Sequence, residues 1–239
     1  PMTSCFTRGA YGCVDACVLK RVLHPPGHPG HANNVAVALH ERRVLTHVHA
    51  ERGGHANVVK LLGALVDPQT AQETTLVLEH GGVDLFRCVM LGVDPCKLIE
   101  VQRKDVEGLA RDAGALDLRS VFGQVRDGVA FLHGFDMAHM DLKLENVVVD
   151  NGGTARIVDF GLARFEGRTA THKACGSKQY QAPQAAARCT FVPLENDIWA
   201  FGIMVFCALN VTFAWKNAAV AGDGLYDLFY AHQVTDAMP

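Results

Sequence analysis

Residues 139–146 read HMDLKLEN, and DFG follows further along the chain at residues 159–161. Between them lie VVV at 147–149, the turn-like DNGG at 150–153 and RIV at 156–158. Apolar β-branched runs on both sides of Asp, Asn and Gly residues predict two short paired strands. The pattern therefore predicts that the polar residues of both sequences lie on two loops that flank one strand pair.

The polar residues of these two loops suit the transfer of a phosphoryl group from a metal-bound nucleotide. Such a transfer depends mainly on positioning and on neutralising charge. A carboxylate such as Asp141 would orient an acceptor hydroxyl and take its proton, and Lys143 would supply positive charge opposite the transferred group. The side-chain oxygens of Asn146 and Asp159 are hard ligands of the kind that Mg²⁺ prefers.

Taken together, the two loops resemble those of eukaryotic-type protein kinases of the serine/threonine type. The resemblance implies an α+β, bilobal protein-kinase-like fold that forms one kinase domain. We expect a small, mainly antiparallel β N-lobe with one helix in residues 1–80, and a larger, mainly helical C-lobe, incomplete at its C-terminus, in residues 81–239.

The resemblance also assigns roles to individual residues. It implies that Asp141 and Lys143 are catalytic and that Asn146 and Asp159 are metal ligands, with ATP and Mg²⁺ as cofactors. The nucleotide-binding residues that it implies are Gly9, Gly12, Val14, Leu78, Glu79, Gly81, Asn146 and Asp159.

Two segments of the N-terminal part carry most of these nucleotide-binding assignments. TRGAYGCV at 7–14 resembles the glycine-rich hairpin that covers ATP phosphates, although Thr7 stands where the first glycine is expected. TLVLEHGG at 75–82 resembles the strand and linker that contact adenine, with Leu78 lining the back of the pocket. Without the resemblance, an ordinary hairpin turn and an ordinary strand-to-helix turn would explain both segments.

The strand that should carry the ATP-binding lysine departs from the family pattern. VAV at 35–37 reads as the third strand, on which kinases carry a lysine that pairs with ATP phosphates and with a helix glutamate. This chain has Ala38 there, and only two residues separate it from the candidate glutamate, Glu41. A deletion or mistaken exon join is the favoured explanation. A degenerate pseudokinase is the second, and a displaced lysine such as Lys20 is the third.

Residues 175–184 (CGSKQYQAPQ) resemble the end of a kinase activation segment. Ser177, together with the catalytic-loop lysine, indicates serine/threonine rather than tyrosine specificity. Met140 replaces the arginine that commonly contacts a phosphate on this segment. We therefore expect activity to depend only weakly on phosphorylation of Thr169 or Thr171.

Two helices of the C-terminal part are predicted from their apolar patterns. From residue 117 to 132, apolar residues follow helical spacing and give one core-facing stripe. The run at 198–209 is apolar or glycine throughout, but polar residues bound it, so we predict a buried core helix rather than a membrane span. By the resemblance, Asp197 holds the backbone of the catalytic loop.

Composition permits this interpretation without selecting it. The chain has 239 residues, 49% of them hydrophobic and 20% charged, with a net charge of −3, which fits one globular unit. The absence of a basic excess argues against nucleic acid and anionic membranes as partners. Eight cysteines without paired spacing indicate free thiols, and we expect a cytoplasmic protein. The histidine-rich stretch at 23–31 reads as an exposed loop rather than a metal site.

Two functions follow from the sequence. The first is an ATP-dependent protein serine/threonine kinase that transfers the γ-phosphate of Mg-ATP to a hydroxyl of a protein substrate. The alternative is a pseudokinase or truncated kinase fragment that acts as a binding or scaffold module. The complete catalytic loop favours the first, whereas Ala38, Thr7 and the early end of the chain favour the second. The oligomeric state is not indicated.

Overall fold

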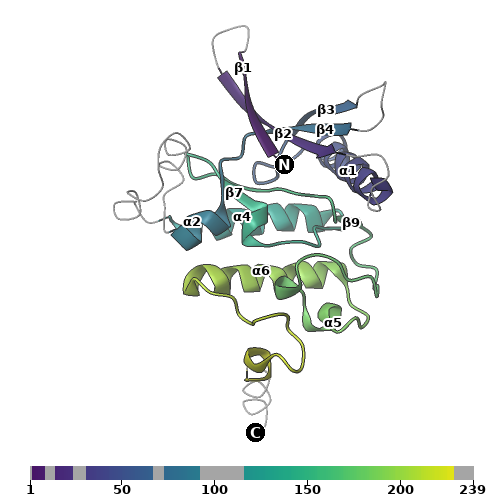
Figure 1. Ribbon diagram of the computed structural model, residues 1–239, viewed down its shortest axis with the longest axis vertical. Coiled ribbons are helices and arrows are strands. Elements are labelled where there is room, and N and C mark those ends of the chain that lie inside the picture. Colours follow the sequence, from purple (N-terminus) through teal and green to yellow (C-terminus); the bar gives the residue numbers. More distant parts are fainter. Residues whose placement is uncertain (1, 9–13, 24–30, 67–72, 92–115, 229–239) are drawn as a thin grey trace.

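The structure, a computed structural model, describes residues 2–8, 14–23, 31–66, 73–91 and 116–228. These residues form two lobes stacked along the long axis of the molecule (Figure 1). A β-sheet with one long helix lies at one end, and a larger set of helices lies below it. The predicted α+β, bilobal architecture is confirmed.

The sheet of the small lobe has four antiparallel strands in the order β1-β2-β4-β3. They are β1 (Met2–Arg8), β2 (Val14–Leu23), β3 (Leu61–Val66) and β4 (Glu73–Glu79). Strand β2 is flanked on both sides, and its residue Lys20 lies opposite Leu76 of β4. Strand β2 is therefore an interior strand whose position is fixed by two neighbours.

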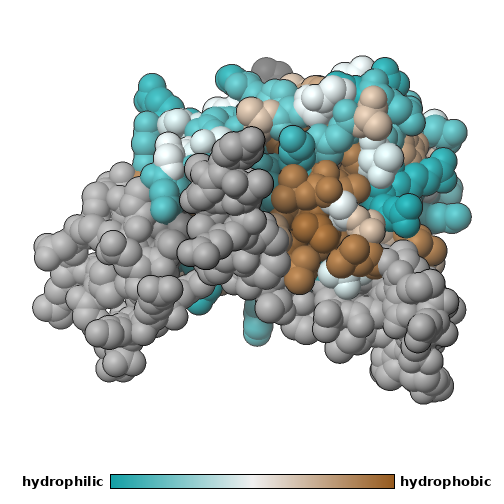
Figure 2. Space-filling model, turned by 90° about the horizontal axis from the view of Figure 1, so that it is seen from above, coloured by the Kyte–Doolittle hydropathy of each residue, from teal (hydrophilic) through white to brown (hydrophobic). Residues whose placement is uncertain are grey.

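One edge strand of this sheet, β3, exposes apolar side chains. Leu62 and Leu65 of β3 are 49% and 62% exposed. Figure 2, which views the molecule from the end where β3 lies in Figure 1, shows apolar residues gathered on that face.

Helix α1 (His31–Thr46) packs beside this sheet and continues into a short π-helix, η1 (His47–Glu51). The prediction of a strand at 35–37 is therefore wrong, because these residues lie inside α1. Ala and Leu, which favour helices, outweigh the two isolated valines of this segment.

The buried positions of this region follow a helical period. Ala38, Glu41, Leu45 and Val48 are all at most 1% exposed, and their spacing of three or four residues places them on one face. A charged residue on the buried face obscured this period in the sequence.

The larger lobe combines helices with two small sheets. Its elements are β5 (Val83–Asp84), α2 (Leu85–Leu91), α4 (Leu118–Gly134), β6 (Met137–Ala138), η3 (Leu144–Asn146), β7 (Val147–Val149), β8 (Ala155–Ile157), β9 (Arg164–Phe165), η4 (Lys178–Tyr180), α5 (Pro183–Ala186) and α6 (Pro193–Asn210). Strands β5, β7 and β8 form one antiparallel sheet, and β6 pairs with β9. The strand pair predicted on both sides of the 150–153 turn is therefore confirmed as β7 and β8.

Helix α4 begins where the sequence predicts. The carboxylate of Asp117 caps it by accepting a hydrogen bond of 3.1 Å from the backbone N–H of Ser120. Val121, Val125 and Leu132 are buried on one face, so the predicted core stripe is confirmed.

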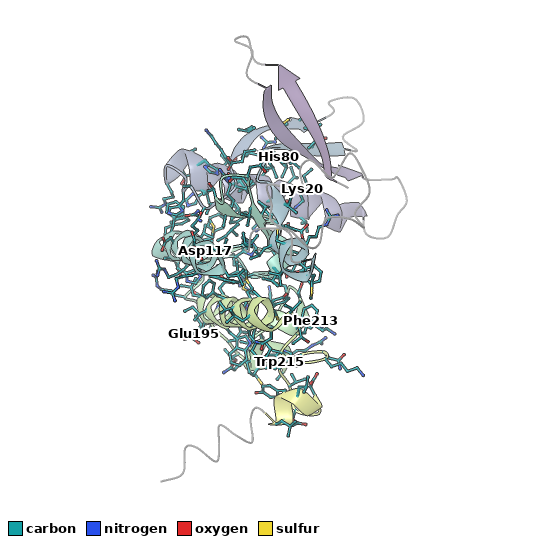
Figure 3. The ribbon with its side chains drawn as sticks, turned by 90° about the vertical axis from the view of Figure 1, so that its left-hand side faces the viewer. Lys20, His80, Asp117, Glu195, Phe213 and Trp215 are labelled. Atoms are coloured by element: carbon teal, nitrogen blue, oxygen red, sulfur yellow. The ribbon has the colours of Figure 1, made fainter. Side chains whose placement is uncertain are left out.

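Helix α6 lies below α4 in the lower part of the molecule (Figure 1). The prediction of a helix through 198–209 is confirmed. No helix in the described part of the chain is both long enough and apolar enough to cross a bilayer. Trp199 of α6 stacks on Trp215, with ring centroids 5.8 Å apart, and Figure 3 labels Trp215 on the chain that follows α6.

Candidate functional site

One buried carboxylate of α6 accepts hydrogen bonds from the backbone of the loop at 139–146. Asp197, which is 1% exposed, accepts hydrogen bonds from the backbone N–H groups of His139 at 2.6 Å and Met140 at 2.9 Å. The ring nitrogen Nε2 of His133 donates a third, at 3.1 Å. The predicted role of Asp197 as the anchor of this loop is confirmed.

The same loop is tied to the DFG sequence through His139. Nε2 of His139 donates to the backbone carbonyl of Val158 at 3.0 Å, and its ring lies edge-on to Phe160, with centroids 5.0 Å apart. His139 and Phe160 are both fully buried. Because the two loops share this packed contact, a shift of one would displace the other.

The carboxylate of Asp141 is surrounded by donors. Its Oδ2 lies 2.9 Å from the Lys143 ammonium and accepts a hydrogen bond of 3.2 Å from the Asn146 amide. Its Oδ1 accepts a hydrogen bond of 2.7 Å from the backbone N–H of Ser177. The Lys143 ammonium also donates to the Ser177 hydroxyl at 2.9 Å. The structure thus brings three predicted site residues together and adds the end of the 175–184 segment to them.

The backbone at Gly176 allows this close approach. Gly176 has φ +86°, and a Cβ atom there would collide with the carbonyl oxygen of Met140. Only glycine meets both conditions without strain. The sequence pattern marked Ser177 as an indicator of serine/threonine specificity, but it carries no signal for the contact between the backbone N–H of Ser177 and Asp141.

Asn146 and Asp159 lie on neighbouring segments. The carbonyl of Asn146 accepts a hydrogen bond of 3.0 Å from Val158, the residue before Asp159. Asp159 has φ 66°, a left-handed conformation that costs energy and is common at functional sites. An amide oxygen and a half-exposed carboxylate form a donor set that fits Mg²⁺, which usually binds through one or two carboxylates and takes its remaining ligands from phosphates and water.

Lys20 pairs with the helix glutamate for which the sequence seemed to offer no lysine. Its ammonium lies 2.8 and 3.0 Å from the two carboxylate oxygens of Glu41 and 2.7 Å from Oδ1 of Asp159. Strand β2, helix α1 and the DFG loop therefore meet at this one cation. Figure 3 labels Lys20 where the sheet of the small lobe approaches the larger lobe.

The charges of this cluster depend on one another. Burial by itself lowers the pKa of the Lys20 ammonium, but the two adjacent carboxylates reverse this and hold it above its ordinary value. Burial by itself raises the pKa of Asp159, but the charge and hydrogen bond of Lys20 leave it below its ordinary value. Burial raises the pKa of Glu41, and Lys20 opposes that rise. The Lys20 ammonium therefore favours the ionised form of the buried Glu41 carboxylate.

The interpretation of Ala38 must be corrected. Ala38 lies on α1 with 1% exposure and does not occupy a strand position from which a lysine is missing. Of the three explanations, the geometry matches the third, a displaced lysine. The sequence ACVLKRVL at 16–23 was the available signal, because it reads as a strand with a lysine among its apolar residues.

Among the other predicted nucleotide-binding residues, Gly9 and Gly12 fall outside the described residues. Leu78, Glu79 and Gly81 lie where the end of β4 leads into the larger lobe. Val14 is the first residue of β2. Leu78 is buried in β4, and Glu79 ends that strand with its side chain accepting a 2.7 Å hydrogen bond from the backbone of Lys60. Gly81 is buried just after the strand. Their contacts with a nucleotide remain predictions.

A cation also lies beside one threonine of the activation segment. Arg164 donates to the hydroxyl of Thr171 at 3.1 Å, whereas Met140 is buried and apolar. The expectation of weak dependence on phosphorylation assumed that a phosphate would find no such partner. For Thr171, that assumption does not hold.

Replacing Asp197 with alanine should destabilise the protein by about 3 kcal/mol, because two buried N–H groups lose their acceptor. Chemical denaturation followed by circular dichroism would measure this loss. Glu195→Ala is the matched control on the same helix, since Glu195 is exposed and should change stability by less than about 0.5 kcal/mol. Equal stability of the two variants would contradict the anchoring role.

Comparison with known proteins agrees with this geometry. The family model described as "Protein kinase domain" matches residues 9–233. Serine/threonine-protein kinase oca2 of Schizosaccharomyces pombe is 30% identical over 185 residues, which are 75% of this chain and 25% of that protein. Serine/threonine-protein kinase ppk8 of the same yeast is 29% identical over 168 residues, 68% of this chain and 28% of that protein.

A plant relative matches a shorter stretch. CBL-interacting serine/threonine-protein kinase 1 of Arabidopsis thaliana is 36% identical over 110 residues, 44% of this chain and 25% of that protein. This chain therefore spans roughly a quarter of the length of these curated relatives. Because the family match covers nearly the whole chain, the chain belongs to the protein kinase domain family, and within it to the serine/threonine type.

Proposed function

We propose that this chain is an ATP-dependent protein serine/threonine kinase that transfers the γ-phosphate of Mg-ATP to a serine or threonine hydroxyl of a protein substrate. The observation that supports this best is the position of Lys20 between Glu41 and Asp159. A kinase needs such a lysine and glutamate pair in place. The scaffold alternative rested largely on the supposed loss of this lysine.

The proposed mechanism divides the work among the residues of the site. Asp141 orients the acceptor hydroxyl and takes its proton, while Lys143, 2.9 Å from that carboxylate, stabilises negative charge on the transferred group. Asn146 and Asp159 would hold Mg²⁺, which supplies charge neutralisation at the phosphates. Lys20 orients the phosphates of ATP.

The remaining assignments place the nucleotide between the lobes. We assign the phosphates to Gly9, Gly12 and Val14 and the adenine to the strand end that contains Leu78, Glu79 and Gly81. We also propose that residues 1–80 form the N-lobe and residues 81–239 the C-lobe of one kinase domain.

The test is phosphate transfer by the purified chain. It is incubated with Mg-ATP and a mixture of peptides that differ only in carrying serine, threonine or tyrosine, and the products are identified by mass spectrometry. We expect phosphate on serine and threonine, loss of transfer when EDTA removes the metal, and recovery when Mg²⁺ is restored, because the proposed site holds the phosphates through the metal. A folded chain that binds Mg-ATP but transfers no phosphate would contradict the proposal and favour the scaffold.

A further inference from the structure

A groove outside the proposed nucleotide site lies between the small-lobe helix and the start of the activation segment. Its volume is about 630 Å³, and it is lined by residues of α1, η1 and β9. The residues that determine its charge and its apolar surface are Leu39, Arg42, Arg43, His47, Glu51 and Phe165.

The groove carries an excess of positive charge. Arg42 and Arg43 are both exposed, and within the described part of the chain neither has a carboxylate at ion-pair distance. The guanidinium of Arg43 lies over the ring of Phe165, 5.4 Å from its centroid. The one acidic residue of the lining, Glu51, contacts Nδ1 of His47 at 2.5 Å. One carboxylate against two guanidinium groups leaves the lining with a net positive charge.

The groove also has apolar contact surface. Leu39, on helix α1, is 47% exposed. Phe165 is held in position by the edge of the His47 ring, with centroids 5.2 Å apart, and His47 in turn contacts Phe135 at 5.8 Å. A fixed aromatic ring next to an exposed leucine provides a ready site for an apolar side chain.

We propose that this groove binds an acidic segment of a partner protein. An apolar side chain of the segment would pack between Leu39 and Phe165, and flanking Asp or Glu carboxylates would pair with Arg42 and Arg43. Charge complementarity selects this occupant, because a basic or neutral segment would leave two arginines without counter-charge. Planar guanidinium groups are well suited to paired hydrogen bonds with carboxylates.

The two walls of the groove are helix α1 and strand β9, and both connect it to Lys20 and its partners Glu41 and Asp159. Helix α1 carries Glu41, next in sequence to Arg42, and β9 follows the DFG sequence closely. His40 of α1 donates to the carbonyl of Ala163 at 2.6 Å, which already joins the two walls. A segment that contacts both walls would hold α1 in the position that keeps Glu41 on Lys20, and it would therefore favour nucleotide binding.

Fluorescence anisotropy would test the docking. The probe is a fluorescein-labelled peptide with leucine and phenylalanine at its centre and three acidic residues on each side. The reference peptides have either lysines in place of the acids or glycine and serine in place of the apolar pair. We expect the acidic apolar probe to bind at least about tenfold more tightly than either reference. Equal binding of the three peptides would overturn the proposal.

Charge reversal would locate the binding site. The double variant Arg42→Glu/Arg43→Glu should weaken probe binding by at least about tenfold, and Leu39→Ser should weaken it independently. The matched control, Arg87→Glu/Arg119→Glu, reverses two exposed arginines on α2 and α4 and should change affinity by less than about twofold. Unchanged binding by the groove variants, or a second copy of the chain found in the groove by sedimentation and cross-linking, would overturn the proposal.

The coupling to nucleotide rests on the proposed function and is measured separately. Saturating Mg-ATP should tighten probe binding by about fivefold or more, and the probe should tighten Mg-ATP binding by the same factor. Mg-ATP binding without this reciprocity would overturn the coupling through α1. Failure of Mg-ATP to bind at all, with probe binding intact, would instead contradict the proposed function and leave the docking site supported.

Discussion

Replacing Asp141 with asparagine should lower the rate of phosphate transfer by about 10³-fold while leaving the affinity for Mg-ATP within about twofold. Asparagine preserves the shape of the side chain but removes the proton acceptor. It also replaces one carboxylate oxygen by an amide that cannot accept from Lys143 or Asn146, which lie 2.9 and 3.2 Å from Oδ2 in the native chain. Single-turnover phosphate transfer and isothermal titration would measure the two quantities.

The control for this variant is Asp127→Asn. Asp127 is an exposed residue of α4 whose one ion-pair partner among the described residues is its neighbour Arg126, so its replacement should leave transfer unchanged. An Asp141→Asn variant that transfers phosphate at more than about a tenth of the native rate would remove Asp141 from the role of base. A variant that loses Mg-ATP binding as well would indicate a structural rather than a catalytic effect.

The larger lobe could be predicted well because its determinants are local in sequence. The 139–146 loop, strands β7 and β8 and the turn between them occupy one short stretch, and each residue type matches the local structure it adopts. Helix α4 was predictable for the same reason, since its cap at Asp117 and its apolar stripe agree.

The small lobe was harder to predict because a buried charge hid the helical pattern. Glu41 faces the core together with Ala38 and Leu45, so a hydrophobic period read from the sequence loses one of its members. The position of Glu41 is favourable only because Lys20, which is 21 residues away in the chain, reaches it. A pairing over that distance produces no pattern in the neighbouring sequence. The short apolar run at 35–37 therefore resembles a strand.

Replacing Lys20 with methionine should lower phosphate transfer by about 10²- to 10³-fold and destabilise the fold by about 3 kcal/mol. The stability loss arises because Glu41, whose side chain is only 2% exposed, would remain buried without a counter-charge. Asp159 would lose the cation that lowers its pKa. Lys60→Met, which changes an exposed lysine of the same lobe, is the control and should change neither quantity appreciably.

A second variant separates the two effects. In Lys20→Met/Glu41→Leu the buried ion pair is replaced by apolar side chains of similar size, a change that is often neutral for stability. We expect the melting temperature to return to within a few degrees of the native value, because the residual change in the free energy of unfolding is small. Phosphate transfer should stay as low as in Lys20→Met. Recovery of activity along with stability would show that Lys20 serves only the fold. Because Ala38 is buried on α1, adding Ala38→Lys to the Lys20→Met background should restore neither property, and rescue by that substitution would instead identify position 38 as the lysine site.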